Sequence, residues 1–294
     1  MRNAVTNRMP DLVWGRRGFS EGRFQTPRAI AVDAQNQLYI VDKTGRIQVF
    51  SADGEYLRGW KMPLTANGKP TGLSFSDDNQ LMVADTHYFR VLFFTLQGEL
   101  IEERTIGGVN GDGNGEFRFV TDVVQDARGH FFVGQYGLSD CIQEFGPTGE
   151  FIRRWGTQGE LPGDFSRPQC LVLDERGYLW VADACNHRFQ VFDVSSSSNV
   201  PPIVTCWGVN GRRPGQLNTP YGFVFDMDGT LLVSEYGNHR CQRFSREGHF
   251  LDVWGEAGAG PGQFSTPWGL ALDANRNLHI LDSLNNRVQR FSLA

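Results

Sequence analysis

Short apolar stretches of four to eight residues, separated by polar turns, follow one another along almost the whole chain. Asp-Gly turns such as Asp53-Gly54 and Asp228-Gly229 separate several of them. This pattern is the signature of β-strands joined by hairpins. No window long enough for a helix shows an apolar period of about 3.6 residues. The sequence therefore predicts an all-β protein.

The pattern also returns at long range, about every 46 to 52 residues. A Trp-Gly or similar signal marks each return, at Trp14, Trp60, Ile106-Gly107, Trp155, Trp207 and Trp254. A fixed period of this size indicates one supersecondary unit copied six times. Each unit has material for about four strands. The expected fold is a six-bladed β-propeller with four antiparallel strands per blade, because radial closure leaves only short, protected edges.

The two ends of the chain complement each other. The last unit stops at Phe291-Ser292-Leu293-Ala294, directly after its third strand, whereas Asp11-Leu12-Val13-Trp14 matches the fourth-strand endings of other units. We therefore expect the N-terminal strand to complete the last blade and close the ring. Residues 1–10 are predicted to form a tail, and residues 11–294 a single propeller domain.

A recurrent motif accompanies this period. Pro-x-x-apolar-x-apolar-Asp is followed by Asp-x-x-Asn-x-Arg-apolar-Gln-x-Phe, as in 168–174 with 183–192 and in 267–273 with 282–291. The motif resembles the NHL repeat of six-bladed propellers and recurs in five or six copies over residues 11–294. The resemblance implies a module that binds proteins or RNA, and a few relatives of that family are zinc-dependent lyases.

Acid–arginine pairs recur in five units, where an acid ends the second strand and an arginine follows four or five residues later. The pairs are Asp42 with Arg46, Asp85 with Arg90, Asp183 with Arg188, Glu235 with Arg240, and Asp282 with Arg287. The third unit has Gln135 and Cys141 at these positions, so both partners are lost together. We interpret the pairs as structural charge-assisted hydrogen bonds that brace the loop between strands two and three.

Long loops fall on one side of the predicted propeller. The loops before the first strands, such as 15–26 and 156–167, have about a dozen residues, whereas the opposite side has tight turns. Binding residues concentrate on loops held by a rigid scaffold. We therefore expect binding on the long-loop face, defined by the loops before the first strand and after the second strand of each blade.

Candidate binding residues on this face differ from blade to blade. Those at the channel mouth follow the proline of the first strand or its equivalent: Arg28, Thr71, Thr121, Gln169, Tyr221 and Trp268. Those after the second strand are Tyr136, His187, Tyr236 and His239. Such variation suits recognition of an asymmetric ligand, although simple absence of structural constraint would also produce it. Aromatic residues of this kind often anchor interfaces.

The histidines give no clear catalytic or metal-binding pattern. The lyases that the chain resembles carry histidines directly after the first-strand prolines, and this chain has none there. His87, His187 and His239 share one register but lie on blades two, four and five, so we expect at least one of them to lie beyond the roughly 2 Å reach of a zinc ligand. We assign no catalytic residue, metal site or cofactor. A calcium ion held by the channel-end acids, as in lactonase-like propellers, is an alternative, but those acids have arginine partners.

Charge and cysteine content narrow the choice of function. The 294-residue chain has 28 Lys and Arg, 33 Asp and Glu and a net charge of −5, which disfavours RNA as the partner. No stretch resembles a membrane span or signal peptide. Five cysteines without a Cys-x-x-Cys pair are typical of free thiols, so we predict a cytoplasmic protein, and we expect a monomer.

The leading functional hypothesis is a non-catalytic scaffold whose long-loop face binds a protein or other macromolecular partner. A metal-dependent hydrolase or lyase with a channel site is the first alternative. An RNA-binding propeller is the second.

Overall fold

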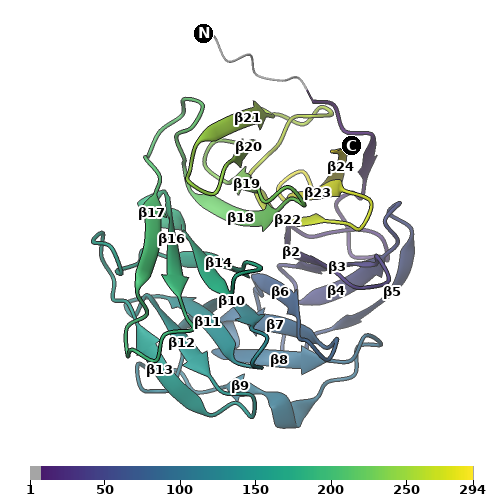
Figure 1. Cartoon of the computed structure of the whole chain (residues 1–294). Coiled ribbons are helices and arrows are strands. Elements are labelled where there is room, and N and C mark those ends of the chain that lie inside the picture. The colour runs from purple at the N-terminus through teal and green to yellow at the C-terminus, as the bar shows by residue number, and fades with distance from the viewer. Residues whose placement is uncertain (1–7, 294) are drawn as a thin grey trace.

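A computed structural model describes residues 8–293, which form six four-stranded antiparallel sheets around a central axis (Figure 1). The strands of each blade are given from the axis outward. Blade one has β2 (Pro27–Val32), β3 (Leu38–Asp42), β4 (Arg46–Phe50) and β5 (Tyr56–Lys61), and blade two has β6 (Gly72–Phe75), β7 (Leu81–Asp85), β8 (Arg90–Phe94) and β9 (Ile106–Gly107). Blade three has β10 (Phe119–Gln125), β11 (Phe131–Tyr136), β12 (Cys141–Phe145) and β13 (Phe151–Trp155), and blade four has β14 (Pro168–Leu173), β15 (Tyr178–Asp183), β16 (Arg188–Asp193) and β17 (Ile203–Trp207). Blade five has β18 (Pro220–Phe225), β19 (Leu231–Glu235), β20 (Arg240–Phe244) and β21 (Phe250–Trp254), and blade six has β22 (Pro267–Leu272), β23 (Asn277–Asp282), β24 (Arg287–Ser292) and β1 (Leu12–Trp14). Three short 3₁₀ turns complete the described elements: η1 (Thr86–Tyr88), η2 (Glu102–Arg104) and η3 (Ala184–Asn186).

The predicted six-bladed fold and its closure are confirmed. Strand β1 pairs antiparallel with β24, with Leu12 opposite Arg290 and Trp14 opposite Val288, and the two lie side by side in Figure 1. The Trp14 ring lies 4.6 Å from the Phe50 ring of blade one, measured between centroids. The N-terminal strand therefore completes blade six and also packs against its neighbour.

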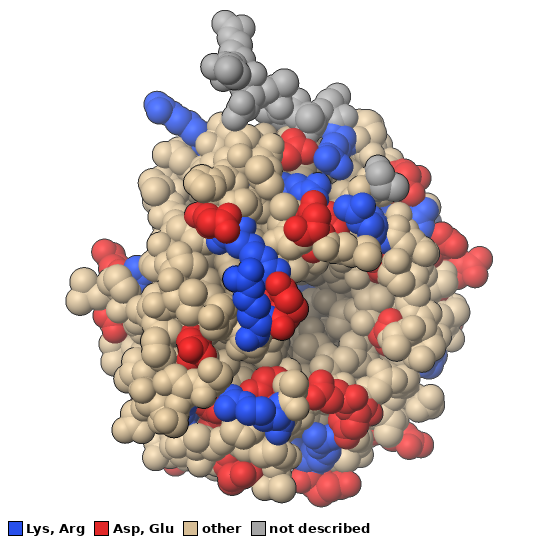
Figure 2. All heavy atoms as spheres, in the orientation of Figure 1, with Lys and Arg blue, Asp and Glu red and all other residues tan. Residues whose placement is uncertain are grey.

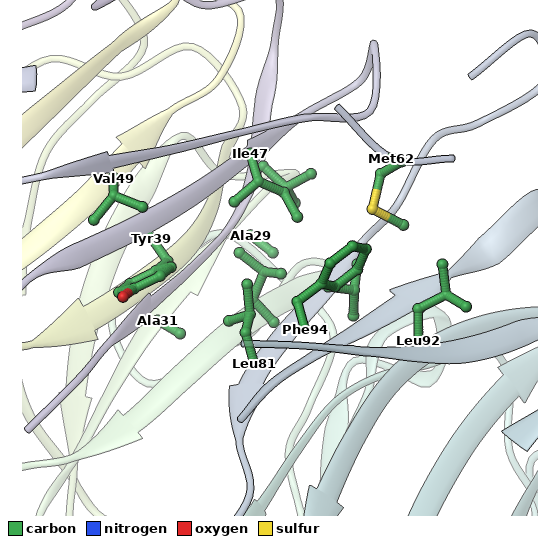
Figure 3. Packing of buried hydrophobic residues seen from close by; sticks show 12 residues of the cluster. Ala29, Ala31, Tyr39, Ile47, Val49, Met62, Leu81, Leu92 and Phe94 are labelled. Carbon is green, nitrogen blue, oxygen red and sulfur yellow. The ribbon is translucent and has the colours of Figure 1, made fainter. Parts of the chain in front are cut away.

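Apolar clusters between neighbouring blades form the core. In the cluster shared by blades one and two, Ile47 and Tyr39 face Leu81 and Phe94 across the gap between the sheets (Figure 3). Further clusters of this kind lie at the other blade boundaries. Because burial of these side chains is lost if a blade tilts, the packing fixes the angles between the blades.

The repeated tryptophans wedge against glycine turns of the next blade. A Cβ atom on Gly54 would lie 2.6 Å from the Trp14 ring, and one on Gly98 would lie 2.4 Å from the Trp60 ring. Both glycines also have positive φ, +81° and +92°. Any side chain there would be strained and would push the tryptophan away. The Trp repeat and the glycine turn are thus two halves of one contact between blades.

Candidate functional site at the channel mouth

The five acid–arginine pairs make contact within their own blades. The nitrogen–oxygen distances are 2.6 Å for Asp42 with Arg46, 2.9 Å for Asp85 with Arg90, 2.8 Å for Asp183 with Arg188, 2.5 Å for Glu235 with Arg240 and 2.6 Å for Asp282 with Arg287. In blade three, where the pair is missing, Gln135 donates instead to the carbonyl of Ser139.

The arginines hold more of the long-loop face than the sequence indicates. Arg188 donates to the carbonyls of Glu160, Leu161 and Asp164 at 2.6 to 2.9 Å, all in the loop that leads into blade four. Arg46, Arg240 and Arg287 repeat this arrangement in their blades. The arginines therefore brace mainly the long loop before the first strand, rather than only the connection between strands two and three.

In blade two, Arg90 pairs with Asp85 but donates to no carbonyl of the long loop among the described residues. One carboxylate oxygen and one guanidinium nitrogen of the pair are buried without a hydrogen-bond partner in the same part of the chain. Burial raises the pKa of Asp85 to about 6, and the contact with Arg90 offsets only part of that effect.

His187 and His239 join neighbouring blades. Nδ1 of His187 accepts a hydrogen bond from the backbone N–H of Thr219, and Nδ1 of His239 accepts one from Thr266, both at 3.0 Å. Each histidine thereby caps the start of the first strand in the next blade. Burial lowers the pKa of His187, which favours the neutral ring that this contact needs. The geometry gives both residues a structural contact, in addition to the binding role that the sequence predicts.

Thr71 and Thr121 connect inner strands. The Thr71 hydroxyl donates to the carbonyl of Thr121, and the Thr121 hydroxyl donates to the carbonyl of Pro168. Thr121 has no exposed surface, so it offers nothing to a ligand, and we do not retain it as a candidate binding residue. Thr71 lines the central cavity, but its hydroxyl is already engaged.

An aromatic and cationic cluster occupies the channel mouth. The ring centroid of Tyr221 lies 4.6 Å from that of Tyr236 and 4.7 Å from that of Trp268. The Arg28 guanidinium lies 4.8 Å from the Trp268 centroid. Four of the predicted residues are thus brought together, and both Tyr221 and Trp268 are only 7% exposed.

Arg167 belongs to this cluster, and the sequence analysis missed it. Its guanidinium lies 4.5 Å from the Tyr136 ring centroid and 5.0 Å from that of Tyr221. It stands immediately before the first-strand proline, where blades one, five and six have Thr26, Thr219 and Thr266. All four residues have a positive φ of 50° to 59°. The replacement of a recurrent threonine by arginine is the signal that could have identified it.

The cluster opens on a narrow cavity between the inner strands. Its volume is about 50 Å³, and residues at its wall include Arg28, Thr71, Asp122, Gln169, Tyr221 and Trp268. This space holds a few water-sized groups, whereas sites for whole small-molecule ligands are roughly 300 to 1,000 Å³. The ring is visibly hollowed at its centre in Figure 2.

Burial and like charge set the electrostatics of the mouth. The pKa of Arg28 is lowered first by burial and then by the positive charge of Arg167. Burial raises the pKa of Tyr221 to about 12, so its hydroxyl is neutral. Deeper in the cavity, burial raises the pKa of the Asp122 carboxyl to about 7. Within residues 8–293, no group of three or more His, Cys, Asp or Glu side chains is arranged to hold a metal ion.

The outer part of the long-loop face has a second hollow of about 480 Å³ between blades one and two. Lys43, Lys61 and Lys69 line it together with the exposed ring of Phe19. On the face in view in Figure 2, by contrast, positive and negative residues lie side by side. The described part of the chain has no helix long and apolar enough to cross a membrane, and its five cysteines form no disulfide.

Comparisons with known proteins agree with this architecture. A family model described as the NHL repeat matches residues 165–192. NHL repeat-containing protein 3 of Mus musculus is 26% identical over 221 residues, 69% of this chain and 60% of that protein. Peptidyl-glycine alpha-amidating monooxygenase of Mus musculus is 36% identical over 235 residues, 77% of this chain but 23% of that protein. The matched region is therefore less than two thirds of either relative.

Among solved structures, a streptogramin B lyase superposes with a TM-score of 0.67 at 13% identity, covering 95% of this chain and 96% of that one. Identity at this level shows a shared fold alone. The family model adds one copy of the repeat in blade four, since the matched segment contains the Asp183 to Phe192 motif. The chain is therefore a six-bladed β-propeller that carries an NHL repeat at residues 165–192 and is similar to NHL repeat-containing proteins.

Proposed function

We propose that this chain is a binding propeller that takes a protein partner on its long-loop face. The observation that carries the proposal is the uneven distribution of exposed apolar side chains. Seven of those in the described residues lie on the long loops: Phe19, Leu64, Val109, Leu138, Leu161, Val209 and Leu284. The turns of the opposite face expose two, Val200 and Met227, and the remaining seven lie on or beside the outermost strands of the blades.

The arrangement of these side chains suits a protein interface. Single exposed apolar residues are common on any surface, but their excess on the loops of one face over the turns of the other is typical of a docking face. The arginine clamps also hold several of the loops in place before a partner arrives, as Arg188 does for the backbone of Leu161. A loop that is already ordered costs less conformational entropy when it binds.

Site-specific photo-crosslinking tests the proposal. A photoreactive phenylalanine analogue replaces Phe19 or Leu161, and Met227 on the opposite face serves as the control because its exposure, 79%, matches the 72% of Phe19. We expect the same discrete protein adduct from positions 19 and 161 and none from position 227. Equal adducts from both faces, or adducts from position 227 alone, would contradict the proposal.

A metal-dependent hydrolase or lyase is the second candidate, because proteins similar to this chain include enzymes, namely an amidating monooxygenase in sequence and a streptogramin B lyase in fold. The test is metal analysis of the purified protein after dialysis without chelator. One equivalent of tightly bound metal per chain would favour this reading over the scaffold. A protein that crosslinks to its partner but contains no bound metal would favour the scaffold.

A further inference from the structure

Two arginines at the channel mouth have no carboxylate partner within residues 8–293. Arg28 comes from blade one and Arg167 from blade four, which stand opposite each other in the ring. The arginines of the loop clamps, such as Arg188 and Arg240, are all paired with acids. Gathering two half-buried cations without a counter-ion is unfavourable because each has lost part of its hydration.

The mouth also has hydrogen-bond donors without acceptors. Nε of Arg28 and Nε2 of Gln169 are buried, and neither has a partner in the described structure. The orientation of the Gln169 amide follows from its neighbour, because its Oε1 accepts a hydrogen bond from Nε of Arg167 at 2.8 Å. Gln169 is only 2% exposed and lines the cavity. Unpaired donors beside uncompensated positive charge call for an anionic acceptor.

The cavity's own carboxyl does not supply that acceptor. Asp122 accepts hydrogen bonds from the backbone N–H groups of Val123 at 3.0 Å and Leu171 at 2.9 Å. Its further hydrogen-bond partner is the Cys170 thiol, and within residues 8–293 it forms no ion pair with Arg28 or Arg167. A carboxylate that pairs with these arginines is therefore not supplied by the described residues and would come from a ligand.

The shape of the mouth favours a small, planar anion. The Arg28 and Arg167 guanidinium groups rest against aromatic rings, which fix their planes. Nη1 of Arg28 donates to the Lys69 carbonyl at 3.4 Å and Nε of Arg167 donates to Gln169, whereas the other N–H groups of both guanidinium groups have no acceptor among the described residues. Those N–H groups match a carboxylate, which accepts two parallel hydrogen bonds. The cavity of about 50 Å³ admits only the end of a ligand.

We propose that Arg28, Arg167 and Gln169 form a subsite that binds a carboxylate presented by the partner. The proposal rests on the proposed protein-binding function and names the chemistry that this function needs at the centre of the face. The carboxylate comes from an acidic side chain or from the C-terminus of a chain, since both present the same group.

Nuclear magnetic resonance titration of the full chain tests the proposal through the indole N–H signal of Trp268. The probes are acetyl-Gly-Gly-Glu-amide, acetyl-Gly-Gly-Gly with a free C-terminus, the neutral acetyl-Gly-Gly-Gln-amide, and inorganic phosphate. We expect saturable shifts of Trp268 but not of Trp155 with at least one carboxylate peptide, and none with the neutral peptide. The carboxylate peptide that binds more tightly identifies the source of the group.

Variants locate the binding energy. Arg167→Gln and Arg28→Gln should each weaken the carboxylate probe at least about tenfold, as expected for loss of a charge-assisted hydrogen bond. Arg213→Gln, an exposed arginine on the same face, should leave affinity unchanged. Unchanged signals of the other tryptophans show that each variant is folded.

Tighter binding of phosphate than of both carboxylate peptides would overturn the proposal, as would the absence of any shift with all four probes. The results also separate failure of the protein-binding function from failure of the carboxylate subsite. Carboxylate binding at Trp268 without a crosslinked partner on the long-loop face would reject the protein-binding role alone. A crosslinked partner without probe binding would reject the carboxylate subsite alone.

Discussion

Asp122 is a carboxyl group held inside the channel wall, and its burial has a consequence for stability. Its pKa is about 7 in the folded protein, compared with an ordinary value of 3.8. Between these values the folded chain holds a proton that the unfolded chain has released. The free energy of unfolding therefore decreases as pH rises from about 4 to 7 through this group. Asp85, with a pKa of about 6, acts in the same direction.

We expect Asp122→Asn to remove its share of this dependence. Between pH 5 and pH 8, the loss of stability should be smaller in the variant than in the wild type by on the order of 2 kcal/mol. Urea denaturation at four pH values measures the difference. The comparison between the two proteins is needed because the lowered pKa values of His87 and His187 oppose the effect in both. Asp77→Asn, on an exposed turn, is the control. Equal slopes in wild type and Asp122→Asn would disprove the assignment.

The arginine clamp is the recurring device at the scale of the element. Arg188 contacts Asp183 and three carbonyls of the loop before β14, with its side chain 11% exposed. Arg188→Ala should lower the free energy of unfolding by about 3 kcal/mol, because it leaves a buried carboxylate unpaired. Amide exchange in residues 159–165 should also accelerate, since the loop loses its attachment.

Arg176→Ala is the matched control for the clamp. Arg176 is 67% exposed and lies 4.0 Å from the equally exposed Glu175, so its loss should cost no more than about 0.5 kcal/mol. If Arg188→Ala kept the free energy of unfolding of the wild type and the same amide exchange rates in the loop, the clamp would not be structural. If that variant nevertheless lost its partner, the arginine would instead be a contact residue.

Closure of the ring is the property that belongs to the whole molecule. Removal of residues 1–15 deletes β1, the fourth strand of blade six, and the Trp14 ring that packs on Phe50 and Phe24. We expect the thermal midpoint to fall by roughly 10 °C or more, since loss of a packed tryptophan alone costs about 3 to 5 kcal/mol. Differential scanning calorimetry measures the shift.

Removal of residues 1–7 provides the comparison, because it leaves β1 intact. The thermal midpoint of this protein should stay close to that of the full chain. If both truncated proteins melted at the same temperature as the full chain, pairing of β1 with β24 would not contribute to stability.

The sequence alone was sufficient for the architecture. Six Trp-Gly or similar signals and the acid–arginine spacing are local patterns that recur along the chain, so each copy supports the others. The complementary ends of the chain then predicted the pairing that closes the ring. The acid–arginine partners could be paired because they lie four or five residues apart on adjoining strands. Residues close in sequence leave few alternatives for how they meet.

Tertiary structure decided the site. Arg28 and Arg167 are 139 positions apart in the sequence, yet closure of the ring brings them from opposite blades to one channel mouth. The same closure buries Thr121 completely, whereas Arg28, at the equivalent position of blade one, stays partly exposed. Which residues of a sixfold repeat meet at the axis, and which of them keep an unpaired donor, depends on packing between blades. A period along the chain cannot specify that, because every copy follows the same pattern.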